Sequence, residues 1–125
     1  MHQIINSQNA PAPIGPYSQA TLAGNTLYIS GQIPIHTSTG NIISGTIEEE
    51  THMVMKNLQA ILKEAGINFP NVVKCSIFVK DMNDFSKINE AYGTYFTENP
   101  PARETVEVSR LPKDVRVEIS CIAVL

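Results

Sequence analysis

The residues whose types and spacing suggest chemistry lie near the C-terminal end, in two strand-like runs joined by a Leu-Pro-Lys-Asp turn. The first run opens on Arg103, and strand alternation places Thr105 on the same face. The second run carries Glu118 among apolar neighbours. An arginine fork binds a carboxylate through two parallel hydrogen bonds, and a glutamate beside a bound substrate can activate water. If the two strands pair as a hairpin, the three side chains share a face and form an anion clamp beside an acid–base group.

The same pattern also admits a purely structural interpretation. Charged side chains on the open face of a strand are usually solvated, and Arg103 and Glu118 could simply pair with each other. Tyr17, Ser30 and Asn89 are equally consistent with a loop hydrogen bond, a strand end and a helix-surface amide. The residue pattern by itself therefore leaves both interpretations open.

The length, net charge and hydropathy of the chain exclude several classes of protein. The chain has 125 residues and a mass of 13.7 kDa, which predicts a single domain spanning residues 1–125. A net charge of -3 argues against nucleic-acid binding through phosphate neutralisation. No run approaches the roughly 18 apolar residues that cross a bilayer, and the N-terminus lacks the features of a signal peptide. We therefore expect no membrane association and a cytoplasmic location.

Cysteine and histidine usage gives no indication of a metal site. Cys75 and Cys121 lie inside strand-like runs, where a free cysteine behaves as a small buried apolar residue. The three histidines show no paired spacing with Cys, Asp or Glu that is typical of metal ligands. We expect neither a structural disulfide nor a metal centre.

Hydrophobic periodicity predicts two helices and about six strands. The first helix begins after Thr46, which has capping-box spacing to Glu49, and ends at Gly66. The second is predicted to be capped by Asp84, with Asn89 beside its apolar stripe of Phe85, Ile88, Tyr92 and Phe96. Strands are expected over residues 18–22, 25–30, 73–80, 104–109 and 115–124, with a possible further strand near the N-terminus and a loop over 36–45.

This element order predicts an α+β domain in which both helices pack on one face of a mixed β-sheet. The other face of the sheet is then uncovered. Phe78 and Ile122 fall on that otherwise polar face, so self-association is the simplest way to bury them.

Most of the chain also resembles the Rid family (reactive intermediate deaminase, or YjgF), in its imine-deaminase branch. The matching segments follow the family's order along nearly the whole length. They are IGPYSQA at 14–20, LYISGQIP at 27–34, NL at 57–58 with EAG at 64–66, VKDMNDF at 79–85 with INE at 88–90, and the run from 100 to 119.

The resemblance implies a chorismate-mutase-like fold and a homotrimer with clefts between subunits. It implies hydrolysis of 2-imino acids, formed from enamines such as 2-aminoacrylate, to 2-keto acids and ammonia, without a cofactor. By motif position, Arg103 would hold the substrate carboxylate and Glu118 would position and activate water. The remaining site residues would be Tyr17, Ser30, Gly31 and Asn89, which line the cleft, and Thr105, which with Gly31 contributes backbone groups.

Two adjacent residues depart from the family pattern. Many members of this branch have Ser-Cys after the arginine, where this chain has Glu104-Thr105, so a thiol role is not available there. Two other functions stay open at this point. One is a trimeric module that binds 2-keto acids without turnover, which would need Arg103 but not Glu118. The other is a ribonuclease or translation-inhibitor activity, which the acidic balance disfavours.

Overall fold

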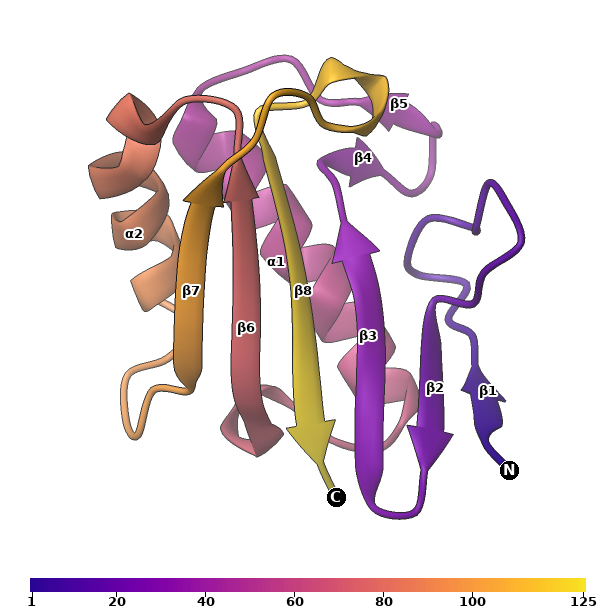
Figure 1. Cartoon of the computed structure of the whole chain (residues 1–125). Helices are drawn as coiled ribbons and strands as arrows, with labels where there is room; N and C mark the ends of the chain where they lie inside the picture. The colour runs from indigo at the N-terminus through magenta and orange to yellow at the C-terminus, as the bar shows by residue number, and fades with distance from the viewer.

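The fold is built on one six-stranded mixed β-sheet (Figure 1). The computed structural model describes residues 1–125. In spatial order the strands are β1 (Gln3–Ile5), β2 (Ala20–Ala23), β3 (Thr26–Gln32), β8 (Val117–Val124), β6 (Val72–Val79) and β7 (Ala102–Glu107). Only β6 and β7 are parallel neighbours; the other adjacent pairs are antiparallel. The predicted α+β class and mixed sheet are confirmed.

A small second sheet lies in a segment predicted to be a loop. Strands β4 (Ile35–His36) and β5 (Asn41–Ile42) pair antiparallel around a turn that contains Gly40 at φ 74°. Short two-residue strands give little period-2 signal in a sequence, so their pairing is set by the turn.

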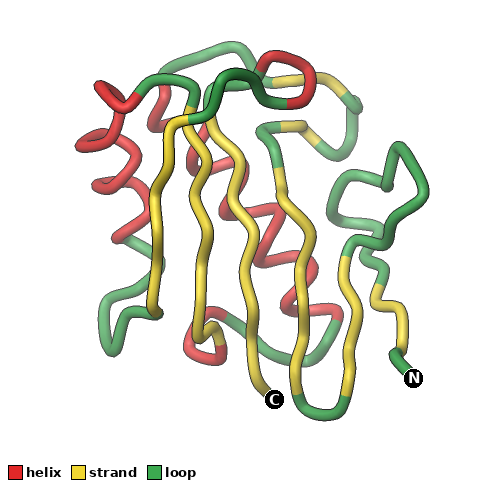
Figure 2. The backbone as a smooth tube through the Cα atoms, in the orientation of Figure 1, coloured by secondary structure: helices red, strands yellow, loops and turns green.

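The two helices, α1 (Ile47–Glu64) and α2 (Phe85–Gly93), lie on the same side of the sheet (Figure 2). At the start of α1 the predicted capping box is present, with reciprocal hydrogen bonds between Thr46 and Glu49. The predicted cap of α2 is wrong. Asp84 has helical backbone angles and makes no capping bond, because a short 3₁₀ helix (Met82–Asp84) precedes α2 and Asp81 caps it.

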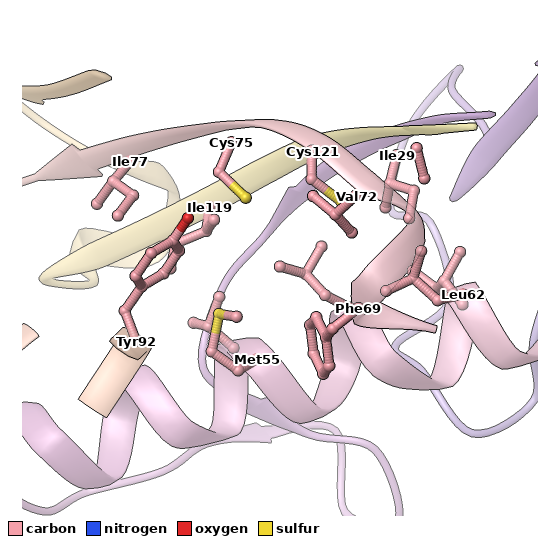
Figure 3. Close-up of a cluster of buried hydrophobic side chains, with 14 of the residues drawn as sticks. Ile29, Met55, Leu62, Phe69, Val72, Cys75, Ile77, Tyr92, Ile119 and Cys121 are labelled. Carbon is pink, nitrogen blue, oxygen red and sulfur yellow. The ribbon is translucent and has the colours of Figure 1, made fainter. Parts of the chain in front are cut away.

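Apolar side chains fill the space between the sheet and the helices (Figure 3). Met55 of α1 lies below Ile119 of the sheet in this core and Leu62 lies below Ile29, and all four side chains are buried. Cys75 and Cys121 are free thiols in the same layer, opposite one another on β6 and β8. They pack as small apolar residues, as predicted, and burial raises the pKa of both thiols.

The two C-terminal strands do not form a hairpin, so the predicted shared face is wrong. β6, α2 and β7 form a parallel crossover unit that places β7 at the edge of the sheet, next to β6. The segment 108–116, with a short 3₁₀ helix (Pro112–Asp114), then carries the chain across β6, and β8 pairs between β3 and β6. β6 therefore separates the strand of Arg103 from the strand of Glu118.

The sheet face away from the helices is partly apolar, as expected from Phe78 and Ile122. Phe78 pairs across strands with Glu118, and Ile122 pairs with Tyr28, which is 48% exposed. Val106 at the edge is 40% exposed. Within one chain no helix covers this face (Figure 1). No helix in the chain is both long and apolar enough to span a membrane.

The capping box at Thr46 allows a direct test of the fold's local energetics. We expect Thr46→Ala to lower the free energy of unfolding by about 1 kcal/mol, because the Glu49 N–H in the first turn of α1 loses the hydroxyl oxygen that accepts its hydrogen bond. Thr46→Ser keeps the hydroxyl, so its free energy of unfolding should fall by only a small part of this amount. Urea denaturation of the three proteins measures the difference, and equal midpoints for Thr46→Ala and the parent would contradict the assignment.

Candidate functional site

The structure divides the predicted site residues into two groups. Arg103, Asn89 and Thr105 lie together at the β7 edge, on the side of the sheet that carries the helices. The second group lines a pocket near the end of β3 and consists of Tyr17, Ser30, Gly31 and Glu118. Within a single chain the two groups do not meet.

Sheet geometry explains the separation of Arg103 from Glu118. Arg103 is in register with Cys75 on β6, whereas Glu118 is in register with Phe78, three positions further along the same strand. An odd number of steps along a strand reverses the side-chain direction, so the two charged groups point to opposite faces of the sheet. They are also about two strand spacings apart across the sheet, roughly 10 Å.

The guanidinium of Arg103 is held by three side chains of α2. Its Nη1 donates a hydrogen bond of 2.6 Å to Oδ1 of Asn89. Its central carbon lies 5.0 Å from the ring centre of Tyr92 and 5.6 Å from that of Phe85, both within cation–π range. The Asn89 bond uses one of five guanidinium N–H donors, which leaves the others for a ligand carboxylate.

Thr105 follows Arg103 on the same face of β7, in register with Ile77. Its hydroxyl oxygen is buried and has no hydrogen-bond partner within the chain. Glu104, the other residue that departs from the family pattern, points to the opposite face, where it accepts a hydrogen bond from Ser76 and lies 2.9 Å from Lys74. These two contacts lower the pKa of Glu104. Glu104 therefore lies apart from the Arg103 group.

The second group surrounds a pocket of about 520 Å³. Glu118 and Ser30 supply polar atoms, and Tyr17 is half-exposed at its wall. The apolar part of the lining is formed by Pro11, Ala12, Ile14, Ile33 and Ile35. The pocket thus combines a single carboxylate with an apolar wall, an arrangement typical of small-molecule sites.

The Glu118 carboxyl lies against Gly31. A Cβ atom at Gly31 would come within 2.5 Å of Oε2 and 2.7 Å of Cδ of Glu118, so a larger residue there would force the carboxyl to move from this position. The pairing of β3 with β8 is irregular between Ile29 and Gln32, where β3 has one residue more than β8. Such bulges redirect side chains at the rims of sheets. The absence of a side chain at Gly31 therefore allows the carboxyl of Glu118 to occupy this position.

Burial raises the pKa of the Glu118 carboxyl above its ordinary value. The half-buried carboxyl makes no hydrogen bond or ion pair in the chain that would favour its charged form. A carboxyl with a raised pKa exchanges protons more readily near neutral pH, which suits a general acid or base.

The loop that carries Tyr17 is held by a buried amide that sequence reasoning did not single out. The Gln19 side-chain amide donates to the carbonyls of Ser7, Ala10 and Pro11, and its oxygen accepts from the Ser7 N–H at 2.6 Å. The Ser30 hydroxyl donates to the Ser18 carbonyl at 2.6 Å, which ties the same loop to β3. Ser30 thus supports the pocket wall, and its proton is already used.

Phe85 and Tyr92 are the other residues missed as part of a site, since both were assigned to the apolar face of the second helix. Their spacing with Asn89 contains the relevant signal: positions i, i+4 and i+7 lie on one helical face. An amide between two aromatic residues on such a face is consistent with a guanidinium partner.

No cluster of three or more His, Cys, Asp or Glu side chains is placed to hold a metal ion.

The raised pKa of Glu118 predicts a pH-dependent stability. In the folded state the carboxyl binds its proton more tightly than in the unfolded state, so its contribution to stability falls as pH rises through the folded pKa. We expect Glu118→Gln to be more stable than the parent at neutral pH, and this gain to shrink in mildly acidic solution. Urea unfolding at both pH values tests this, with exposed Glu98→Gln as the control. A gain that is independent of pH would contradict it.

Nearly the whole chain is similar to proteins of one known family. A family model described as endoribonuclease L-PSP matches residues 7–125. A RutC family protein of Pyrococcus horikoshii is 55% identical over 98% of both chains. Human 2-iminobutanoate/2-iminopropanoate deaminase is 46% identical over 99% of this chain and 90% of its own. A crystal structure of a conserved Rid-family protein from Yersinia pestis is 45% identical and superposes over 100% of both chains with a TM-score of 0.97. The chain therefore belongs to the Rid family, also called YjgF or endoribonuclease L-PSP.

Proposed function

We propose that the protein hydrolyses reactive 2-imino acids, such as 2-iminopropanoate and 2-iminobutanoate, to 2-keto acids and ammonia. The observation that carries the proposal is the carboxyl of Glu118, half-buried in a pocket and seated against Gly31 with a raised pKa. A guanidinium with free donors at Arg103 supplies the complementary anion site. The human relative bears the name of this activity at 46% identity.

The chemistry needs only positioning and proton transfer. Arg103 binds the substrate carboxylate, which places the imine carbon opposite the water held by Glu118. Glu118 accepts a proton as the water oxygen bonds to the imine carbon, and the imine nitrogen gains a proton to give a carbinolamine. The carbon–nitrogen bond then breaks as the hydroxyl proton is lost, which releases ammonia and leaves the 2-keto acid. General acid–base catalysis contributes about 10²- to 10⁴-fold in such steps.

A site with both groups requires two chains, because Arg103 and Glu118 face opposite sides of one sheet. We propose a homotrimer in which Arg103 and Asn89 of one subunit meet Tyr17, Ser30, Gly31 and Glu118 of a neighbour. The uncovered sheet face supports association, since Tyr28 and Val106 are exposed there. Burial of apolar surface of this kind favours self-association.

The first functional test is a coupled assay. Added to a pyridoxal-phosphate-dependent serine or threonine dehydratase, the protein should speed the appearance of pyruvate or 2-oxobutyrate. Arg103→Ala should reduce this acceleration by at least about 100-fold, because two charge-assisted hydrogen bonds to the carboxylate are lost. Arg110→Ala removes an exposed arginine paired only with Asp114, and should keep full activity. No acceleration with any amino-acid-derived imine would reject the proposal.

The intersubunit site makes a separate prediction about mixtures. Arg103→Ala and Glu118→Gln should each be inactive, yet co-refolded in equal amounts they should regain about a quarter of parental activity. Random assembly gives one site in four with both native residues, if each site takes one residue from each of two neighbours. Activity measured on co-refolded and on simply mixed proteins checks this. No recovery in co-refolded trimers that contain both variants would place the site within one chain.

The same experiments separate the competing functions. A keto-acid-binding module would bind 2-oxobutyrate with unchanged affinity in Glu118→Ala and show no turnover in the parent. A ribonuclease would degrade RNA after purification to homogeneity and lose that activity with Arg103. The net charge of -3 offers no general attraction for a phosphate backbone.

A further inference from the structure

The helix α2 presents one continuous face to Arg103. Phe85, Asn89 and Tyr92 are spaced i, i+4 and i+7, so their side chains lie on one side of the helix. All three contact or approach the guanidinium: Asn89 accepts its Nη1–H at 2.6 Å, and the two rings lie 5.6 Å and 5.0 Å from its carbon. We call these three residues the arginine cradle.

Tyr92 is the most firmly fixed member of the cradle. It is buried, whereas Phe85 is partly exposed. Its ring packs 4.9 Å from that of Phe96, so the aromatic cluster behind it limits its movement. Figure 3 shows the ring rising from α2 with its hydroxyl directed toward β6, where Cys75 and Ile77 lie. The ring therefore links the core of the protein to the guanidinium of Arg103.

The Tyr92 hydroxyl has a feature that packing alone does not explain. It is buried and has no hydrogen bond of ordinary geometry within the chain, and the group beside it is the weakly polar thiol of Cys75. Burial raises the pKa of the phenol, so the ring is neutral and meets the guanidinium as a π-system rather than as an anion. A neutral ring holds the cation without neutralising it, and the positive charge stays available to a ligand.

A held guanidinium matters for an anion clamp. The arginine side chain has several rotatable bonds, and a carboxylate that binds a mobile guanidinium must first order it. A guanidinium that is already held in place therefore binds a carboxylate more tightly than a mobile one, although the atoms that make the contact are the same. Asn89 fixes the orientation of the guanidinium in its plane, and the rings of Phe85 and Tyr92 restrict its movement out of that plane.

We propose that Tyr92 is a positioning residue, which acts with Phe85 and Asn89 to hold Arg103 ready for a planar carboxylate. The identity of the ligand rests on the proposed function, whereas the positioning of Arg103 does not. Tyr92 contacts the guanidinium and no reacting atom, so it acts on carboxylate binding through Arg103.

The test compares Tyr92→Leu, which removes the ring, with Tyr92→Phe, which keeps it. Phe96→Leu is the matched control, because it removes an aromatic side chain from the same cluster without touching Arg103. Phe85→Leu tests the cradle at a partly exposed position, where a loss of packing is better tolerated. Two quantities are measured for each folded protein: the hydrogen-exchange rate of Arg103 Nε–H by NMR, and the dissociation constant of 2-oxobutyrate by calorimetry.

We expect Tyr92→Leu to raise both the exchange rate and the dissociation constant by about fivefold, in the range of partly desolvated cation–π pairs. Phe85→Leu should act in the same direction with a smaller effect, since its ring is further away. Tyr92→Phe and Phe96→Leu should stay within about twofold of the parent in both quantities, because each keeps the ring that packs on Arg103.

Two outcomes would overturn the proposal. One is an Arg103 exchange rate that is the same in Tyr92→Leu and Phe85→Leu as in the parent. The other is an equal increase in Phe96→Leu, which would assign the effect to general loosening of the core. If 2-oxobutyrate does not bind the parent protein, the proposed function fails, and the exchange measurement still decides whether the cradle holds Arg103.

Discussion

The position of β8 between β3 and β6 is the constraint on which the rest of the structure depends. It makes the sheet continuous from β1 to β7 and places the core strands against α1. The same insertion puts β6 between Arg103 and Glu118 and, through strand alternation, turns them to opposite faces. Two groups that a hairpin would have placed together are therefore kept apart within one chain, so the proposed site needs a second chain to bring them together.

The two half-sites differ in how they are prepared. Glu118 is placed by the absence of a side chain at Gly31 and by a bulge in β3, and its partial burial favours the protonated form. Arg103 is placed by contacts: one amide hydrogen bond and two aromatic rings from a single helix. The first half-site adjusts the proton affinity of a carboxyl and the second limits the motion of a cation. Both features would serve the proposed site, in which a small anion meets groups that are already in place.

Local patterns predicted the elements well and their pairing poorly. The capping box at Thr46, the alternation around Cys75 and the apolar face of α1 are encoded within a few neighbouring residues, and each is confirmed. The cap at Asp84 was wrong because a preceding 3₁₀ turn moved the capping role to Asp81. The buried network of Gln19 could not be predicted, since its partners are backbone carbonyls whose positions depend on the folded loop.

The sequence by itself determined the α+β class, the limits of α1 and the identities of the candidate residues, because these follow from periodicity, capping and side-chain chemistry over short ranges. It also carried the family resemblance, which the comparisons confirm. Only the tertiary structure decided which strands are neighbours, which face each charged group occupies and which rings surround Arg103. Those features depend on contacts between segments far apart in the chain, and strand alternation alone is compatible with more than one pairing.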